Sequence, residues 1–141
     1  MRAPMSGIAS YRAQHQRLLA MVKQLEDELE RKATRGAELR KRVSTLVGKL
    51  SLHLAAEDEV LYPKLLEHSE ERVRTLAQKY LDETGGLADD FRAYADRWPS
   101  PASIDANPIA FASQTRRILA TLKKRISRED DRLFPLIEKL R

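Results

Sequence analysis

The sequence contains no cysteine, which excludes disulfides, thiolate nucleophiles and cysteine-bound iron–sulfur clusters. Only 5 of its 141 residues are glycine and 42% are apolar, a balance that favours helices over a turn-rich β fold. No apolar run is long enough to cross a membrane, and the first residues lack the apolar core of a secretory signal. We therefore expect a cytoplasmic protein that folds as a single domain over residues 1–141.

The formal charge is +5, and two short basic clusters stand at residues 40–42 and 123–125. Clusters of this kind can attract phosphates. Acidic residues are interspersed along the whole chain, however, and no nucleic-acid-binding motif accompanies the basic ones. A solvated helix surface is the simpler interpretation. We expect neither a nucleic acid nor a membrane as a partner, and a homodimer is left open.

Apolar residues recur at alternating intervals of three and four, the spacing of a helix with one buried face. The pattern occurs in four segments, which lie within residues 8–29, 39–60, 73–98 and 111–136. The first two connections are short, which implies antiparallel neighbours, whereas residues 98–108 form a longer loop-like stretch. The sequence thus predicts an all-α fold, arranged as an up-down antiparallel four-helix bundle.

Each of the four apolar stripes is interrupted by a polar or charged residue where a bundle normally places leucine. Burying an unpaired charge is costly, so four independent accidents are implausible. We expect these residues to meet in the core, where they satisfy one another or share a ligand. They are His15 in the first segment, His53 and Glu57 in the second, Glu83 in the third, and Arg125 and Glu129 in the fourth.

The chemistry of these residues indicates a metal site. His53 and Glu57 stand four residues apart, so an imidazole nitrogen and a carboxylate oxygen can reach the same point beside one helix. Imidazole and carboxylate without thiolate suit iron, manganese or zinc, and bundle cores can hold di-iron carboxylate sites. The candidate ligands, enough for one metal and marginal for two, are His15, His53, Glu57, Glu83 and Glu129.

Each of these residues also has a purely structural interpretation. A single histidine in a core stripe, such as His15, is more often hydrogen-bonded than metal-bound. Glu57 could pair with Arg125 as a buried ion pair. Glu83 could face solvent if the Gly-Gly pair that follows it shifts the phase of the helix. The presence of imidazole and carboxylate groups on several different helices favours the metal site over these alternatives.

The chain contains an internal repeat, because residues 53–63 (HLAAEDEVLYP) align without a gap with residues 125–135 (RISREDDRLFP). Both halves carry a glutamate at the fifth position and end in an aromatic residue followed by proline. The histidine that opens the first half is replaced by Arg125 in the second. Together with His15 in QHQRLLAMV, these stretches resemble the hemerythrin-like, or HHE cation-binding, family. That family has a histidine on its first helix and an H-x-x-x-E motif before an aromatic–proline pair.

The resemblance covers nearly the whole chain and implies a hemerythrin-like bundle that binds iron in a mono- or dinuclear site. It also implies a role in oxygen, nitric oxide or redox sensing or protection, with dioxygen or nitric oxide as the ligand of the metal. Zinc and manganese are alternative metals. The alternatives in function are a metal-free bundle that acts as a scaffold or regulatory partner-binding protein, and a ferritin-like di-metal oxidase. No catalytic residues are predicted.

The ligand set of this chain differs from the family pattern at two places. The third helix has no histidine, and Glu83 is the residue near the ligand position that the family uses there. On the fourth helix, Arg125 stands where the family has histidine. A guanidinium has no lone pair to offer a metal and stays charged. We therefore expect Arg125 to pair with Glu129, Glu57 or Glu83.

Overall fold

The computed structural model describes the backbone of residues 3–31 and 35–140 and the side chains of residues 7–31 and 35–140. Every regular element within these residues is a helix, so the predicted all-α class is confirmed. The elements are α1 (Ala3–Glu30), α2 (Gly36–Ala56), η1 (Glu57–Leu61), α3 (Tyr62–Leu66), α4 (Glu71–Thr84), α5 (Leu87–Arg97), α6 (Pro101–Ala106), α7 (Pro108–Arg128), η2 (Glu129–Leu133) and α8 (Phe134–Lys139).

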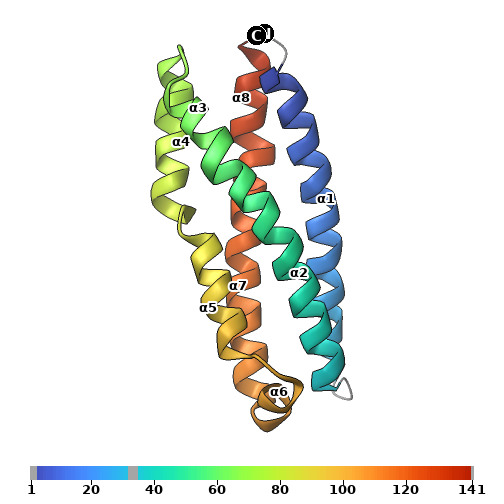
Figure 1. Cartoon of the computed structure of the whole chain (residues 1–141). Helices are drawn as coiled ribbons and strands as arrows, with labels where there is room; N and C mark the ends of the chain where they lie inside the picture. Colours follow the sequence, from blue (N-terminus) through green and yellow to red (C-terminus); the bar gives the residue numbers. More distant parts are fainter. Residues whose placement is uncertain (1–2, 32–34, 141) are drawn as a thin grey trace.

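The helices stand side by side as long rods in Figure 1: α1, the α2–α3 pair, the α4–α5 pair and the α7–α8 pair. The short helix α6 lies at the lower end, between α5 and α7. The prediction of a loop over residues 98–108 is wrong in this respect. Ser100 and Ser103 form a capping box in which each side chain bonds the backbone of the other, and this starts the helix.

Two π-helical turns, η1 and η2, interrupt the rods at equivalent places in the internal repeat. In each, the N–H of an aromatic residue donates to a glutamate carbonyl five residues back, Tyr62 to Glu57 and Phe134 to Glu129. A proline follows each aromatic residue. Because proline has no N–H and its ring clashes with the carbonyl four residues back, a wider turn accommodates it better than a regular one. The repeated aromatic–proline pair therefore places a π turn directly after each of these glutamates.

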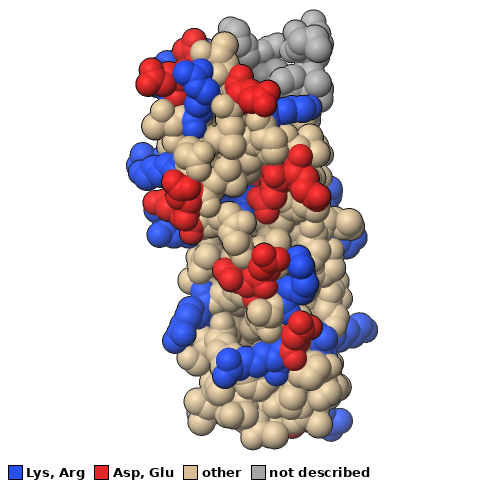
Figure 2. Space-filling model, turned by 60° about the vertical axis from the view of Figure 1, so that its left-hand side comes forward, with Lys and Arg blue, Asp and Glu red and all other residues tan. Residues whose placement is uncertain are grey.

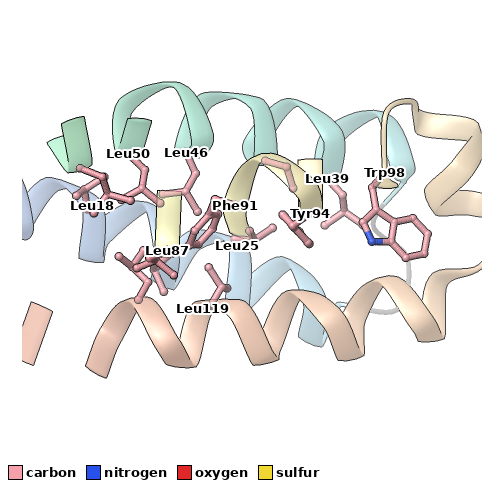
Figure 3. Close-up of a cluster of buried hydrophobic side chains, with 14 of the residues drawn as sticks. Leu18, Leu25, Leu39, Leu46, Leu50, Leu87, Phe91, Tyr94, Trp98 and Leu119 are labelled. Carbon is pink, nitrogen blue, oxygen red and sulfur yellow. The ribbon is translucent and has the colours of Figure 1, made fainter. Parts of the chain in front are cut away.

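The apolar core is divided into two clusters along the rods. The larger contains leucines of α1, α2 and α7, together with Phe91 and Tyr94 of α5 and Trp98 directly after it, which follow one another towards the α6 end (Figure 3). The smaller cluster includes Ile8, Tyr11, Leu61, Tyr62, Leu133 and Phe134. Buried polar residues stand where one cluster gives way to the other along the chain: His15 between Tyr11 and Leu18, Glu57 between Leu54 and Leu61, and Glu129 between Ile126 and Leu133. A buried polar layer thus separates two apolar ones.

Gly36 allows a close contact between α2 and α6. Its N–H donates to Asp105 Oδ1 at 2.8 Å, so a side chain from a distant element satisfies the first turn of α2. A methyl group at residue 36 would overlap the carbonyl oxygen of Pro101 and the carboxylate of Asp105. The sequence Thr34-Arg35-Gly36 predicts a break between the first two helices. Thr34 lies outside the described residues, and α2 begins at Gly36.

The surface carries charges of both signs. Acidic and basic side chains are interspersed over the face shown in Figure 2, and long tan areas separate them. Among the helices that the structure describes, none has the combination of length and apolar character needed to span a membrane.

Candidate metal centre

Four of the five predicted metal ligands meet in the polar layer. His15 comes from α1, His53 from α2, and Glu57 and Glu129 are the first residues of η1 and η2. All four are buried, and each offers one ligand atom that lies within 4.8 Å of the others. The predicted convergence of these four residues inside the helical core is confirmed.

The ligand atoms lie within hydrogen-bonding distance of one another. His15 Nε2 lies 3.2 Å from Glu57 Oε2 and 3.1 Å from Glu129 Oε1, and His53 Nε2 lies 3.0 Å from Glu57 Oε2. Even so, His53 Nε2 and Glu129 Oε1 have no hydrogen-bond partner of acceptable geometry among the described residues. Buried polar atoms of this kind are normally satisfied. Two unsatisfied atoms that face one small region could therefore bind a cation placed between them.

Both histidines are held by their outer ring nitrogens. His15 Nδ1 lies 2.7 Å from Asp130 Oδ1, and His53 Nδ1 lies 2.6 Å from Gln14 Oε1. Both partners are acceptors, so each Nδ1 donates its proton and each Nε2 can turn a lone pair towards the cluster. Metal-binding histidines typically have such an outer partner. The sequence reasoning missed Asp130 and Gln14, although the acidic residue that follows the glutamate in both halves of the repeat was a usable signal for the aspartate.

Arg125 occupies the opposite side of the two glutamates. It is buried, and it donates to Glu57 Oε1 at 2.9 Å, to Glu129 Oε2 at 3.2 Å and to Asp58 Oδ1 at 2.7 Å. A fourth bond, to the carbonyl of Thr84, is 3.1 Å long. The predicted pairing of Arg125 with Glu57 and Glu129 is confirmed. Each glutamate thus gives one oxygen to the guanidinium and turns the other towards the histidines.

Comparison with known protein families identifies the family of this chain. The hemerythrin HHE cation binding domain matches residues 6–137, nearly the whole chain. The chain belongs to the hemerythrin HHE family. No curated protein and no solved structure gives a significant match to it. The match includes His15 and both halves of the internal repeat, so the HHE assignment covers every residue of the buried cluster.

Glu83 does not join the HHE cluster, which corrects the prediction that it would. Its side chain is about one-third exposed (34%) and pairs with Arg128 on the outside of α7. Thr84 is the buried residue at this level of α4, and it contributes its backbone carbonyl to Arg125. The predicted stripe ran from Tyr80 to Glu83, a step of three, whereas the helix buries residues four apart at this point. The helix phase therefore turns Glu83 towards solvent.

Tyr62 is a further member of the site that sequence reasoning did not assign. Its hydroxyl donates to Glu129 Oε2 at 2.7 Å, and its ring lies under the Arg125 guanidinium, 5.4 Å from centroid to Cζ. The side chain is buried, which makes such a hydrogen bond and cation–π contact stronger than at a surface. Tyr62 therefore fixes the orientation of both the glutamate and the guanidinium.

Proton affinities in the site follow from its burial and charges. Burial lowers the pKa of His15, but hydrogen bonds with Glu129 and Glu57 and their charges outweigh this and raise it from 6.5 to about 10. For Glu57, burial raises the pKa, but the hydrogen bonds of both histidines and the charge of Arg125 hold it well below its usual range. Burial and the neighbouring charge of Glu57 raise the pKa of Glu129 to about 7. In the metal-free site, His15 is therefore protonated at neutral pH and supplies positive charge to both glutamates.

The donor set fits one divalent cation on that side. Four carboxylates, those of Glu57, Asp58, Glu129 and Asp130, and the single guanidinium of Arg125 give the layer a formal charge of −3 when both histidines are neutral. A divalent ion would offset most of this charge. Two imidazole nitrogens and two carboxylate oxygens are also ligands that iron, manganese and zinc accept.

Proposed function

We propose that this protein is a hemerythrin-like up-down four-helix domain that binds one divalent metal ion, with iron as the first candidate. The ligands in this proposal are His15, His53, Glu57 and Glu129. The observation that carries it is the pair of unsatisfied buried atoms, His53 Nε2 and Glu129 Oε1, in a cluster whose histidines already donate their outer protons. Membership of the HHE cation-binding family supports the same conclusion.

The number of ions in this proposal is one because Arg125 fills the other half of the layer. Its guanidinium bonds the remaining oxygen of each glutamate, and the family pattern has a histidine at this position. A fixed positive charge repels a second cation at close range. Arg125 therefore replaces one metal electrostatically, and the histidine side keeps the other.

The residues around the ion would divide the remaining tasks. Asp130 and Gln14 hold the imidazoles in the tautomer that presents Nε2, and Tyr62 and Arg125 hold the glutamates. Bound iron would supply redox chemistry and affinity for dioxygen or nitric oxide. A role in oxygen, nitric oxide or redox sensing or protection, and a cytoplasmic location, remain predictions that follow from the family and the composition.

Metal analysis of purified variants tests the proposal. Protein reconstituted with Fe²⁺ under anaerobic conditions and then desalted should carry one iron per chain. His53→Ala should lower this content sharply while circular dichroism shows that the helices persist. His68→Ala is the matched control, because His68 lies outside the cluster. Among the described residues, its ring accepts a hydrogen bond only from the backbone N–H of Glu70. This variant should leave the iron content unchanged.

The other outcomes separate the competing functions. The metal-free scaffold is favoured by one observation, that Arg125 and a protonated His15 can neutralise both glutamates without a metal. Equal and negligible metal in all three proteins would establish it. Two irons per chain together with rapid consumption of dioxygen would instead indicate a di-metal oxidase.

A further inference from the structure

A groove on the surface between α1 and α2 borders the metal cluster from outside. Its volume is about 490 Å³, and its apolar lining includes Leu18, Met21 and Leu52. Leu52 is 75% exposed, and it is one of three large apolar residues that are exposed in the described part of the chain. The volume falls in the range of small-molecule sites, about 300–1,000 Å³.

The polar lining of this α1–α2 groove has one sign of charge. Arg17 and Lys49 both line it, and no acidic residue does. Both cations are exposed, and neither forms an ion pair with the described residues, although many other surface cations do. An apolar surface beside two unpaired cations is complementary to a molecule with an apolar tail and an anionic head.

We propose that the α1–α2 groove binds a small amphipathic anion, a carboxylate with a short apolar tail. The tail lies against Leu18, Met21 and Leu52, and the carboxylate lies between Arg17 and Lys49. The proposal goes beyond the metal function, because the groove and its cations are complete without any ion in the core. The ligand in this proposal is a free small molecule, because the volume of the groove is that of a small-molecule site.

His53 gives this proposal a local reporter. Its ring and its partner Gln14 both line the groove, while the inner nitrogen of the ring faces the metal cluster. A ligand in the groove therefore changes the surroundings of the His53 ring directly. The chain has three histidines, so their ring C–H signals can be resolved in one spectrum. His68, which does not line the groove, is an internal control.

Titration of the metal-free full-length chain with decanoate, below the concentration at which micelles form, tests the proposal by NMR. The ring signals of His53 should shift saturably and those of His68 should not. Decanol should bind more weakly and decyltrimethylammonium should not bind. Lys49→Glu and Arg17→Glu should each weaken decanoate binding about tenfold, the effect of losing a close charge pair near a surface. Leu52→Asp should abolish binding.

Two matched controls make the test specific. Lys124→Glu makes the same charge change on α7, and Ile109→Asp makes the same polar change at another exposed apolar residue. Both should bind decanoate like the unmodified protein. The proposal is overturned if the His53 signals do not move, if the controls weaken binding as much as the groove variants, or if only anionic lipid vesicles, and not monomeric decanoate, are bound.

Discussion

Replacing Arg125 with methionine removes a guanidinium from between three carboxylates and keeps a side chain of similar length. In the metal-free protein, Glu57 and Glu129 then lose the cation that bonds one oxygen of each, although both remain buried. Removing one partner of a buried ion pair costs about 3–5 kcal/mol. We expect a loss of about 3 kcal/mol, the lower end of this range, because Tyr62 keeps its hydrogen bond to Glu129 and Asp58 is partly exposed.

Urea unfolding of the metal-free protein at pH 8, followed by circular dichroism, measures this loss. With a slope of about 2 kcal/mol per molar urea, a loss of about 3 kcal/mol lowers the midpoint by about 1.5 M. The loss should be smaller at pH 5.5, where Glu129, whose pKa is about 7, takes up a proton. Lys124→Met removes a neighbouring exposed cation and should change stability by less than about 0.5 kcal/mol. A shift for Arg125→Met no larger than that of this control would refute the reasoning.

Three further predictions concern the layer and its surroundings. Arg125→His restores the H-x-x-x-E motif on α7 and should raise the iron bound per chain towards two in an anaerobic titration; equal or weaker binding would mean that residue 125 is not a lost ligand position. The folded-state pKa of His15, about 10, exceeds its unfolded value near 6.5, so its stabilising contribution is complete below about pH 6.5 and is lost as the pH rises towards 10. The free energy of unfolding of the metal-free protein should fall between pH 7 and 9 by up to about 1.4 kcal/mol per pH unit, and parallel profiles for the unmodified protein and His15→Gln would contradict this. Gly36→Ala should destabilise the protein by about 1–3 kcal/mol, because the added methyl group overlaps α6. Gly48→Ala, in the same helix but with open space around it, should stabilise the protein by about 0.5–1 kcal/mol. Thermal melts in which both variants shift the melting temperature in the same direction would exclude the close contact between Gly36 and α6.

The four ligands that converge could be predicted because each is a polar residue in an otherwise apolar stripe. Burial makes such an interruption expensive, so the pattern carries information about tertiary contacts. The same reasoning failed at Glu83 because the steps of three and four were taken in the wrong order from Val73. The predicted stripe ran through Leu76, Tyr80 and Glu83, whereas the helix buries Ala77, Tyr80 and Thr84. Counted backwards from the aromatic residues of α5, alternate steps of three and four reach Thr84, Tyr80 and Ala77, which are the buried residues.

The outer partners of the site could not be predicted from periodicity. Gln14 and Asp130 lie next to core positions rather than on them, and each acts only because a histidine on a different helix is within reach. Their roles depend on how two helices are rotated relative to each other, which one stripe does not determine. The π turns after Glu57 and Glu129 contribute to this rotation, and the proline that causes each turn was visible in the repeat.

The polar layer between the two apolar clusters also has a consequence for how the helices align lengthwise. Apolar surfaces alone would tolerate α7 sliding along α1 by one turn, about 5.4 Å, because leucine then meets leucine again. Such a slide would withdraw Arg125 from Glu57 and Glu129 from His15, and it would break the buried ion pairs that join this rod to the other helices. A misaligned bundle is therefore far less stable than the native one. The buried charges select a single lengthwise register for the helices, as a buried polar residue does in a coiled coil, and they do so before any ion binds.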